Sequence, residues 1–297
     1  MKMKKITVSI PFYNSLEYFE DSIRIPLFDD RVDEILVVDD CSTEDEYQGL
    51  LKKVQSLLDG QEISFDPNSS LVAEQNSHCL HSIMTMTMVN VSEQSKKIKV
   101  IRNKNNLGGF ANKYEAVKNA KNDWVYLLDS DNFLVECSIP AIFNIENWDY
   151  QTCYCPSVII MERKNQGWRA WDDWNHRKFG YDSLGLEQIQ NLFRLDKSLH
   201  NQTGCGLGTN GFLNTGNFFV NKSTYVDCLK EPIENNLEPY AADVIAFSYY
   251  WLTSDNKFKI VPDLYYYHRL RSDSFWQRTG SLAGYEAQKY EEMIKNA

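Results

Sequence analysis

The sequence of 297 residues lacks two features that would each define a class of protein. Basic residues are not in excess, because 31 Lys and Arg stand against 41 Asp and Glu, for a formal net charge of −10. Broad binding of nucleic acid needs a field of Lys and Arg, so this charge argues against it. A long apolar run is missing too: the longest, Val244 to Leu252, falls far short of the ~20 residues that cross a bilayer. We therefore expect a soluble protein without an integral membrane segment.

Paired cysteines and an export signal are also missing. The seven cysteines are odd in number and scattered, which favours free thiols in a reducing compartment. Cys153 and Cys155 form the one close pair, without a second pair or a His at zinc-finger spacing, so core packing is the expected role. The first apolar stretch is interrupted at Pro11 before a signal-peptide core could form. These observations predict a cytoplasmic location.

The first half of the chain alternates strand and helix patterns. Strands separated by helix-length segments indicate a parallel sheet covered on both faces, whose ligands collect at the carboxyl ends of the strands. Four loops therefore converge on one edge. The strands are expected at 6–10, 34–38, 98–101 and 124–128, and the helices at 18–25, 47–58 and 110–120. In the second half we expect a strand at 214–220, a helix at 241–252, a strand at 258–261 and a helical tail from 284.

Two carboxylates follow the last of those four strands. Asp129 and Asp131 stand two residues apart, directly after the apolar run 124–128. A buried strand that ends in this D-x-D turn offers hard oxygen ligands at an open sheet edge, which suits a divalent cation that also holds phosphate oxygens. Asp is also an ordinary turn residue after a strand, so the neighbouring motifs decide the interpretation.

The loop after the third strand has the composition of a phosphate-binding segment. Arg102, Asn106, Gly108, Gly109 and Asn112 belong to this loop and to the helix that follows it. Glycine lets the backbone approach a ligand closely, and a helix start offers free N–H groups to anions. Contacts to a ribose and a diphosphate are expected here, although the two glycines also suit an ordinary tight loop.

Aromatic residues gather in the second half. Trp168, Trp171, Trp174 and His176 are interleaved with Arg and Asp. Rings that cover sugar faces and carboxylates that take sugar hydroxyls make such a segment a candidate carbohydrate-binding wall. Part of this cluster would serve equally well as core.

Taken together, four segments resemble the inverting family 2 glycosyltransferases of GT-A fold. They are residues 6–14, 34–42, 106–109 and 129–132, in the family's order and at strand ends. The resemblance covers about residues 4 to 140 and continues more loosely through Asp243 to His268. It implies an α/β fold with a Rossmann-like, mostly parallel central sheet flanked by helices, and a smaller mixed acceptor-side region.

The resemblance also implies a donor site. Pro11 and Tyr13 would flank the nucleotide base, and Asp40 would accept a hydrogen bond from a pyrimidine imide. Asp131 would bind Mn2+ or Mg2+, with Asp129 contacting the ribose or the metal's shell. His268 corresponds to a position where a His completes that shell or touches the diphosphate.

On the acceptor side the resemblance implies a catalytic base. Asp243 matches the acidic position at the start of a helix in the second half, although the Glu that usually precedes it is Ala242 here. Glu238 is the nearest substitute, and as a structural alternative Asp243 is a favourable first residue of a helix. Asn217 lies where the family lines its acceptor pocket.

We therefore expect one GT-A domain over residues 1–297. It would have a nucleotide-binding half at 1–135 with an insertion at about 59–97, an acceptor-binding half at 136–270 and a helical tail at 271–297. The predicted activity is metal-dependent, inverting transfer of a sugar from a nucleoside diphosphate, with UDP expected, to a hydroxyl of a glycan. The alternatives are a nucleotidyltransferase, for which a Gly-rich, basic loop after the first strand is missing, and a non-catalytic binding relative.

Overall fold

The computed structural model describes residues 4–59, 97–163, 167–172, 182–195, 216–269 and 275–297. Its first half alternates strands with helices, as the sequence predicts. The elements are β1 (Ile6–Phe12), η1 (Leu16–Tyr18), α1 (Phe19–Phe28), β2 (Val32–Asp39), α2 (Glu44–Leu58), β3 (Ile98–Arg102), α4 (Gly109–Lys118) and β4 (Trp124–Leu127).

The second half contributes further strands and three long helices. Its elements are β5 (Phe133–Leu134), α5 (Ser138–Phe143), β6 (Thr152–Arg163), β7 (Gly167–Asp172), β8 (Ser183–Leu184), α7 (Leu186–Leu195), β9 (Phe218–Asn221), α9 (Lys222–Glu234), η3 (Tyr240–Ala242), α10 (Asp243–Thr253), β10 (Lys257–His268) and α11 (Phe275–Asn296). Among the described helices, none is both long and apolar enough to cross a membrane.

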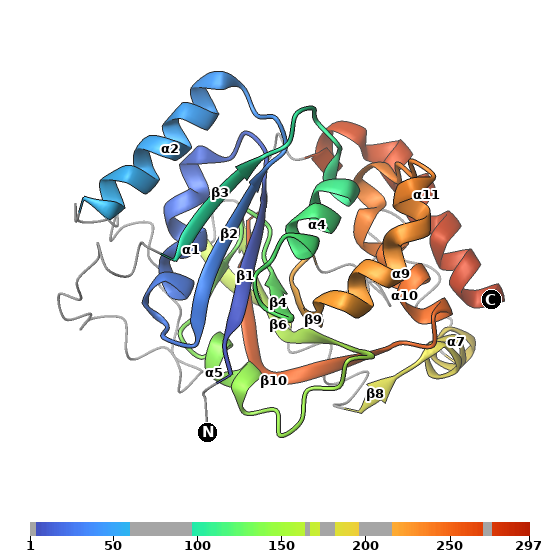
Figure 1. The fold of residues 1–297 in the computed structure, drawn as a ribbon. Helices are drawn as coiled ribbons and strands as arrows, with labels where there is room; N and C mark the ends of the chain where they lie inside the picture. Colours follow the sequence, from blue (N-terminus) through green and yellow to red (C-terminus); the bar gives the residue numbers. More distant parts are fainter. Residues whose placement is uncertain (1–3, 60–96, 164–166, 173–181, 196–215, 270–274) are drawn as a thin grey trace.

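All of these strands join one ten-stranded sheet (Figure 1). Its order is β3-β2-β1-β4-β9-β6-β10-β5, with β7 paired to β6 and β8 paired to β10. The four strands β3, β2, β1 and β4 run parallel, β9 is antiparallel to β4 and β6, and β6 runs parallel to β10. Because β4 and β9 are hydrogen-bonded, the two halves of the chain share a continuous sheet.

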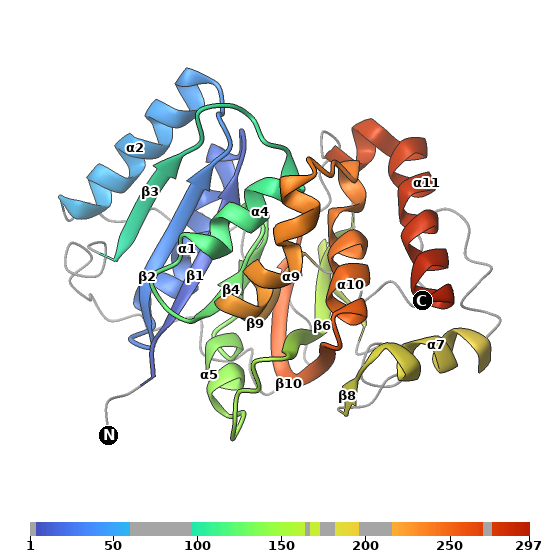
Figure 2. The ribbon, with the colours of Figure 1, turned by 45° about the vertical axis from the view of Figure 1, so that its right-hand side comes forward.

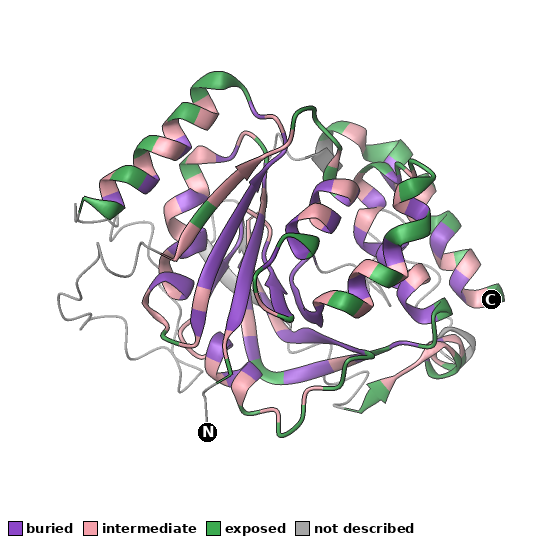
Figure 3. Cartoon of the chain, in the orientation of Figure 1, coloured by how far each residue is buried: buried purple, intermediate pink, exposed green. Residues whose placement is uncertain are grey.

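Helices cover both faces of the sheet (Figure 2). Along β2 the buried side chains alternate: Ile35 and Val37 pack in the core beneath α1 and α2, whereas Leu36 and Val38 pack in the core beneath α4, α9 and α10. This period of two is what a strand buried on both faces requires. Figure 3 shows the result as a row of buried central strands between partly exposed helices.

The elements expected from the sequence are found with changed bounds in the second half, where the strand expected at 214–220 is β9, Phe218–Asn221. The strand expected at 258–261 runs on to His268, and the helical tail begins at Phe275 instead of 284. The strand β6 and the helix α9, both in the second half, were not anticipated from the sequence. Most of the predicted insertion, residues 60–96, lies outside the described residues.

Candidate active site

The loops after β1, β2 and β4 meet at one edge of the sheet, as the parallel order requires. The backbone N–H of Asn14 donates to the Ser42 hydroxyl at 2.9 Å, which joins the ends of β1 and β2. The Ser15 hydroxyl donates to that of Ser130, in the middle of the D-x-D turn, at 2.8 Å. These contacts bring the predicted base-binding loop and the predicted metal-binding turn together.

The D-x-D turn is fixed by residues from distant segments. Asn217, fully buried just before β9, accepts a hydrogen bond from the Asp129 backbone N–H at 2.8 Å. The Arg269 guanidinium donates to the Asp131 carbonyl at 3.2 Å and pairs with Asp21 of α1 at 2.9 Å. These hydrogen bonds fix the backbone of the turn, and so they fix the positions from which the two Asp side chains extend.

A glycine makes room for the Asp129 carboxylate. A Cβ atom added at Gly216 would lie 1.9 Å from Asp129 Oδ2, closer than real Cβ contacts occur. Gly216 directly precedes Asn217. The segment that binds the backbone of Asp129 is therefore also shaped around its side chain.

A lysine joins Asp129 to the candidate base. Lys113 of α4 pairs through Nζ with Asp129 Oδ1 at 3.0 Å and with Asp243 Oδ2 at 2.7 Å. Burial by itself would lower the pKa of Lys113, but the two carboxylates outweigh burial and raise it above its ordinary value. Burial raises the pKa of Asp129, and Asp131 and Asp243 add to that rise while Lys113 opposes it. The fold thus brings Asp129 and Asp243 into one charged cluster.

Asp243 is the first residue of α10, where a carboxylate is favoured by the helix dipole. It lies 3.9 Å from the position that a Cβ would take on Gly109. Glu238, the substitute base, lies opposite Gly108, whose φ is +81° and whose Cβ would stand 2.4 Å from Glu238 Oε2. Burial raises the pKa of Glu238, and Asp243 and Asp40 add to this rise. Both candidate bases therefore face the start of α4.

Asp40 is buried and holds the loop that precedes α4. Its Oδ1 accepts hydrogen bonds from the Leu107 N–H at 2.8 Å and from Asn103 Nδ2 at 2.9 Å, and its Oδ2 accepts one from the Gly108 N–H at 3.0 Å. Burial raises the pKa of Asp40, and these donors oppose the rise. A carboxylate offers about four acceptor positions, and donors among the described residues occupy three of them.

The surroundings of Asp40 include two exposed apolar groups. Tyr13, which follows β1, is 42 % exposed, and Leu107 is 39 % exposed. Pro11 is half-buried within β1, opposite Val38 of β2. Tyr13 and Pro11 were predicted to flank a nucleotide base, and Leu107 is an additional apolar group in the same neighbourhood.

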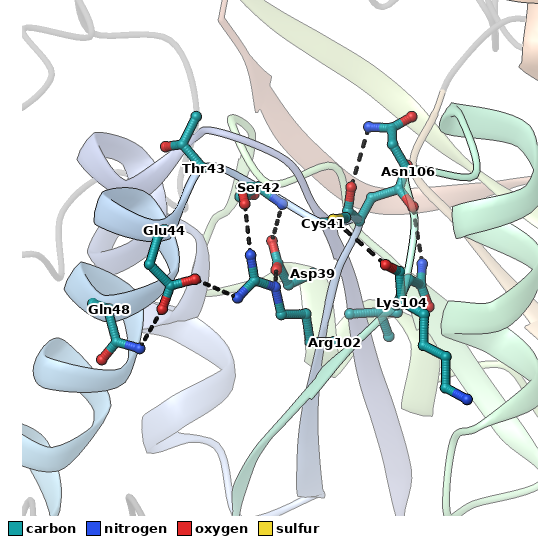
Figure 4. Close-up of polar contacts among 12 residues, drawn as sticks. Asp39, Cys41, Ser42, Thr43, Glu44, Gln48, Arg102, Lys104 and Asn106 are labelled. Atoms are coloured by element: carbon teal, nitrogen blue, oxygen red, sulfur yellow. Dashed lines mark hydrogen bonds and ion pairs between the residues drawn. The ribbon is translucent and has the colours of Figure 1, made fainter.

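Arg102 has partners at the end of β2 and at the start of α2, of which Asp39, Ser42 and Glu44 are labelled in Figure 4. Its guanidinium pairs with Asp39 at 3.1 Å and with Glu44 at 2.8 Å, and it donates to the Ser42 carbonyl at 2.8 Å. It also stacks over the Tyr47 ring at 4.2 Å. This arrangement fastens β3 to the β2–α2 connection, so a structural role accounts for Arg102 without a ligand.

The two asparagines predicted with Arg102 also have protein partners. The Asn106 side chain donates to the Asp40 carbonyl at 3.1 Å and accepts from the Gly108 N–H at 3.1 Å. Asn112 is buried, donates to the Val38 carbonyl at 3.2 Å and accepts from Asn103 at 3.0 Å. These bonds shape the loop around Asp40. Direct contact of either residue with a nucleotide stays a prediction.

The residues present suit a cation that is shared with a substrate. The described residues hold no group of three or more His, Cys, Asp or Glu placed to bind a metal. Asp131 and Asp129 lie close enough for Asp131 to raise the pKa of Asp129. Cations such as Mg2+ are often held by one or two carboxylates together with substrate phosphates. The D-x-D turn fits this mode, with phosphate oxygens completing the coordination.

His268 ends β10 beside the same cluster. Burial lowers its pKa, a direction that favours the neutral ring, while nearby Asp129 opposes the change. Its buried Nδ1 has no hydrogen-bond partner among the described residues. A neutral imidazole with an unused nitrogen is a competent metal or phosphate ligand. Its predicted role therefore remains open to a direct test.

The predicted acceptor wall is only partly covered. Trp168 and Trp171 lie in β7, which pairs with β6, and their side chains are outside what the structure describes. Trp174 and His176 lie outside the described residues altogether. Asn217 lies against the D-x-D turn, where its side chain accepts the hydrogen bond from the Asp129 backbone N–H.

Comparison with known families shows which proteins this chain is similar to. The family model described as "Glycosyl transferase family 2" matches residues 87–214, somewhat less than half of the chain. Over these residues the chain is similar to the family 2 glycosyltransferases. The matched region contains Lys113 and the D-x-D turn, while Asp40, Asp243 and His268 lie outside it. No curated protein sequence matches the chain significantly.

Solved glycosyltransferase structures resemble this domain in fold. A structure of GalNAc-T7 with UDP, GalNAc and Mn2+ aligns with a TM-score of 0.50 at 14 % identity, over 91 % of this chain and 44 % of that one. S. aureus TarS 1–349 with UDP-GlcNAc aligns with a TM-score of 0.49 at 17 % identity, over 98 % and 70 % respectively. The predicted GT-A fold and the assignment as a glycosyltransferase are confirmed.

Several residues of the glycosyltransferase site were missed from the sequence. Gly216 and Ser15 were not assigned roles, and Leu107 was quoted only as part of a motif. Lys113 stands beside Asn112, and the resemblance to the family left open which of these two residues takes part in the site. The helical spacing offered one signal, since neighbouring positions on a helix point to different faces.

Proposed function

We propose that this glycosyltransferase transfers a sugar from a nucleoside diphosphate sugar to a hydroxyl of a glycan, with inversion at the anomeric carbon. The Lys113 bridge carries the proposal, because it places the donor-side Asp129 and the candidate base Asp243 in a single cluster. UDP is the proposed nucleotide and Mn2+ or Mg2+ the proposed cation, since both UDP and Mn2+ are present in the GalNAc-T7 structure.

In this mechanism the Asp243 carboxylate takes the proton of the acceptor hydroxyl. The acceptor oxygen forms a bond to the anomeric carbon as the bond from that carbon to the diphosphate oxygen breaks. The nucleoside diphosphate leaves with the electron pair, and one displacement inverts the configuration. A cation bound by Asp131 and the phosphates would stabilise the charge on the leaving diphosphate.

In this proposal the base and the ribose of the sugar donor bind at the loops around Asp40. The remaining acceptor position of its carboxylate suits an imide N–H, and Tyr13 offers an exposed ring beside it. The cytoplasmic location expected from the sequence stays a prediction, as do the acceptor and the division into donor and acceptor halves.

Calorimetry of the purified protein with UDP, GDP, dTDP and CDP, each with and without Mn2+, tests the donor site. We expect one diphosphate to bind and its affinity to depend on the metal. Binding of the metal alone should be weak, because the described residues offer too few ligands. If no diphosphate binds in either condition, the proposal is wrong.

Transfer itself is tested with sugar donors of the nucleotide that binds. Donor hydrolysis or transfer that disappears in Asp131→Ala, with folding preserved, supports the proposal. A protein that binds the diphosphate but neither hydrolyses nor transfers would be a non-catalytic relative. Release of pyrophosphate from a nucleoside triphosphate would instead identify a nucleotidyltransferase.

A further inference from the structure

Lys113 connects elements that are far apart in the sequence. It lies within α4, whereas Asp129 follows β4 and Asp243 begins α10. The three side chains are largely shielded from solvent, with exposed fractions of 13 % for Lys113, 25 % for Asp129 and 14 % for Asp243. Ion pairs shielded in this way are screened by salt much less than surface pairs.

The bridge satisfies charges that would otherwise destabilise the site. Asp243 raises the pKa of Asp129, so the two carboxylates repel each other across the cluster. The ammonium between them offsets this repulsion, and removing one partner of a buried pair leaves the other uncompensated. The geometry of both carboxylates therefore depends on Lys113.

A second lysine on the same helix provides a contrast. Lys118 pairs with Glu115, one turn earlier on α4, at 2.9 Å, and its side chain is 49 % exposed. That pair joins two residues of one helix and touches neither Asp129 nor Asp243. A basic residue elsewhere on α4 does not bridge Asp129 and Asp243. The position of Lys113 on the helix is what lets it contact both carboxylates.

We propose that Lys113 is a positioning residue, whose ammonium fixes the base carboxylate of Asp243 relative to Asp129 on the donor side and so sets the rate of transfer. The inference rests on the proposed function. It differs from a role in holding the diphosphate, because both carboxylates already engage the ammonium at hydrogen-bond distance.

A double-mutant cycle in urea tests the bridge without relying on activity. Lys113→Met, Asp243→Asn and the double variant are compared with the wild type through their equilibrium constants of unfolding. We expect Lys113→Met to lose about tenfold or more in stability, and Asp243→Asn to be far less harmful, or even stabilising, on the Lys113→Met background. If the change in the unfolding equilibrium constant of the double variant equals the product of the two single changes within about threefold, the two residues are not coupled and the bridge is overturned.

Kinetics and binding separate positioning from nucleotide contact. In Lys113→Met we expect kcat to fall about 100-fold, as misplacement of a reacting group does, while the Kd for UDP stays within about threefold because no donor contact is lost. Lys113→Arg should recover part of kcat, since a guanidinium can also pair with two carboxylates. Lys118→Met is the matched control and should match the wild type.

The outcomes distinguish this inference from the proposed function. A Kd for UDP that weakens tenfold or more in Lys113→Met, with kcat preserved, would mean that Lys113 binds the nucleotide and would overturn positioning. A wild type that binds no diphosphate and transfers no sugar would overturn the proposed function. The unfolding cycle would then still report whether the bridge exists.

Discussion

Two basic side chains at the same edge of the sheet each join a pair of carboxylates, and they differ in what those carboxylates belong to. Arg102 joins Asp39 and Glu44, which lie at the two ends of one short connection between β2 and α2. Lys113 joins Asp129 and Asp243, which come from opposite halves of the chain. Similar ion-pair chemistry thus fastens a local connection in one place and assembles a site in the other.

Exposure separates the two clusters only at Glu44. The Glu44 side chain is 65 % exposed, whereas Asp39, the other partner of Arg102, is fully buried and both partners of Lys113 are mostly shielded. Exposed ion pairs contribute little and are screened by salt, while shielded ones depend strongly on every partner. The role of a basic residue in a predicted site therefore follows from which segments of the chain supply its acidic partners, and not from the sequence motif in which it stands.

The largest expected effect is at the Lys113 cluster. Asp243→Asn removes the proposed base and should reduce transfer by about 10² to 10⁴-fold, the usual contribution of general base catalysis. The Kd for the nucleoside diphosphate should not change, which calorimetry checks. Glu238→Gln is the matched control and should retain most of the activity. The reverse ranking would assign the base to Glu238.

A smaller effect is expected from crowding the same cluster without changing its charge. In Gly216→Ala the new Cβ would meet Asp129 Oδ2 at 1.9 Å, so the carboxylate must move. We expect transfer to fall about 10 to 100-fold, as small displacements of reacting groups do. Gly284→Ala is the control, since nothing lies within 4 Å of its added Cβ. Unchanged kinetics in Gly216→Ala would show that Asp129 is not needed in its present position.

Arg102→Met tests the other side of the comparison. Because Arg102 is fully engaged by Asp39, Glu44 and the Ser42 carbonyl, its loss should lower stability in urea unfolding and leave transfer kinetics within about threefold. The part of this loss that comes from the exposed pair with Glu44 should shrink at 1 M salt, where exposed pairs are screened. A tenfold weaker Kd for the nucleotide would support the predicted place of Arg102 in the donor site.

The smallest effect concerns Lys97, a lysine that is held by carbonyl oxygens. Its ammonium donates to the carbonyls of Asp29 and Val32 at 3.0 and 3.1 Å. Burial lowers its pKa to about 8 from 10.5, with Asp29 and Asp30 opposing the change. Lys113, with two carboxylate partners, shifts in the opposite direction.

This lowered pKa fixes the sign of a pH effect. Below about pH 8 both the folded and the unfolded chain carry the proton on Lys97, and the cost of burying the charge is fully present. Between about pH 8 and 10.5 the folded state releases the proton first, so the free energy of unfolding rises with pH. Urea unfolding of the wild type and Lys97→Met across this range checks the prediction. Equal pH slopes would contradict it.

The sequence predicted those parts of the molecule that local patterns determine. The strands β1, β2 and β4 follow from short apolar runs that end in polar loops, and the convergence of those loops follows from parallel order. The strand β6 was missed because Tyr154 and the residues around it carry no clear alternation of apolar and polar side chains. Its place in the sheet is set by pairing with β10 along most of its length.

The candidate site was predicted only in part, for a related reason. Asp129 and Asp243 were found because strand ends and helix starts can be read from the chain. Lys113 meets both carboxylates only in the folded chain, and the carboxylate partners of Arg102 could not be foreseen either. Pairing between distant segments has no signature in a single sequence.

The Arg269 contact to the Asp131 carbonyl has a consequence for how the enzyme is made. The D-x-D turn leaves the ribosome long before Asn217 and Arg269, yet both residues bond its backbone. The first half of the sheet can begin to form during synthesis, whereas the turn is completed only after the last strand has docked. A nascent chain therefore becomes competent late, and chains terminated before residue 269 would lack the bond from Arg269 to the turn.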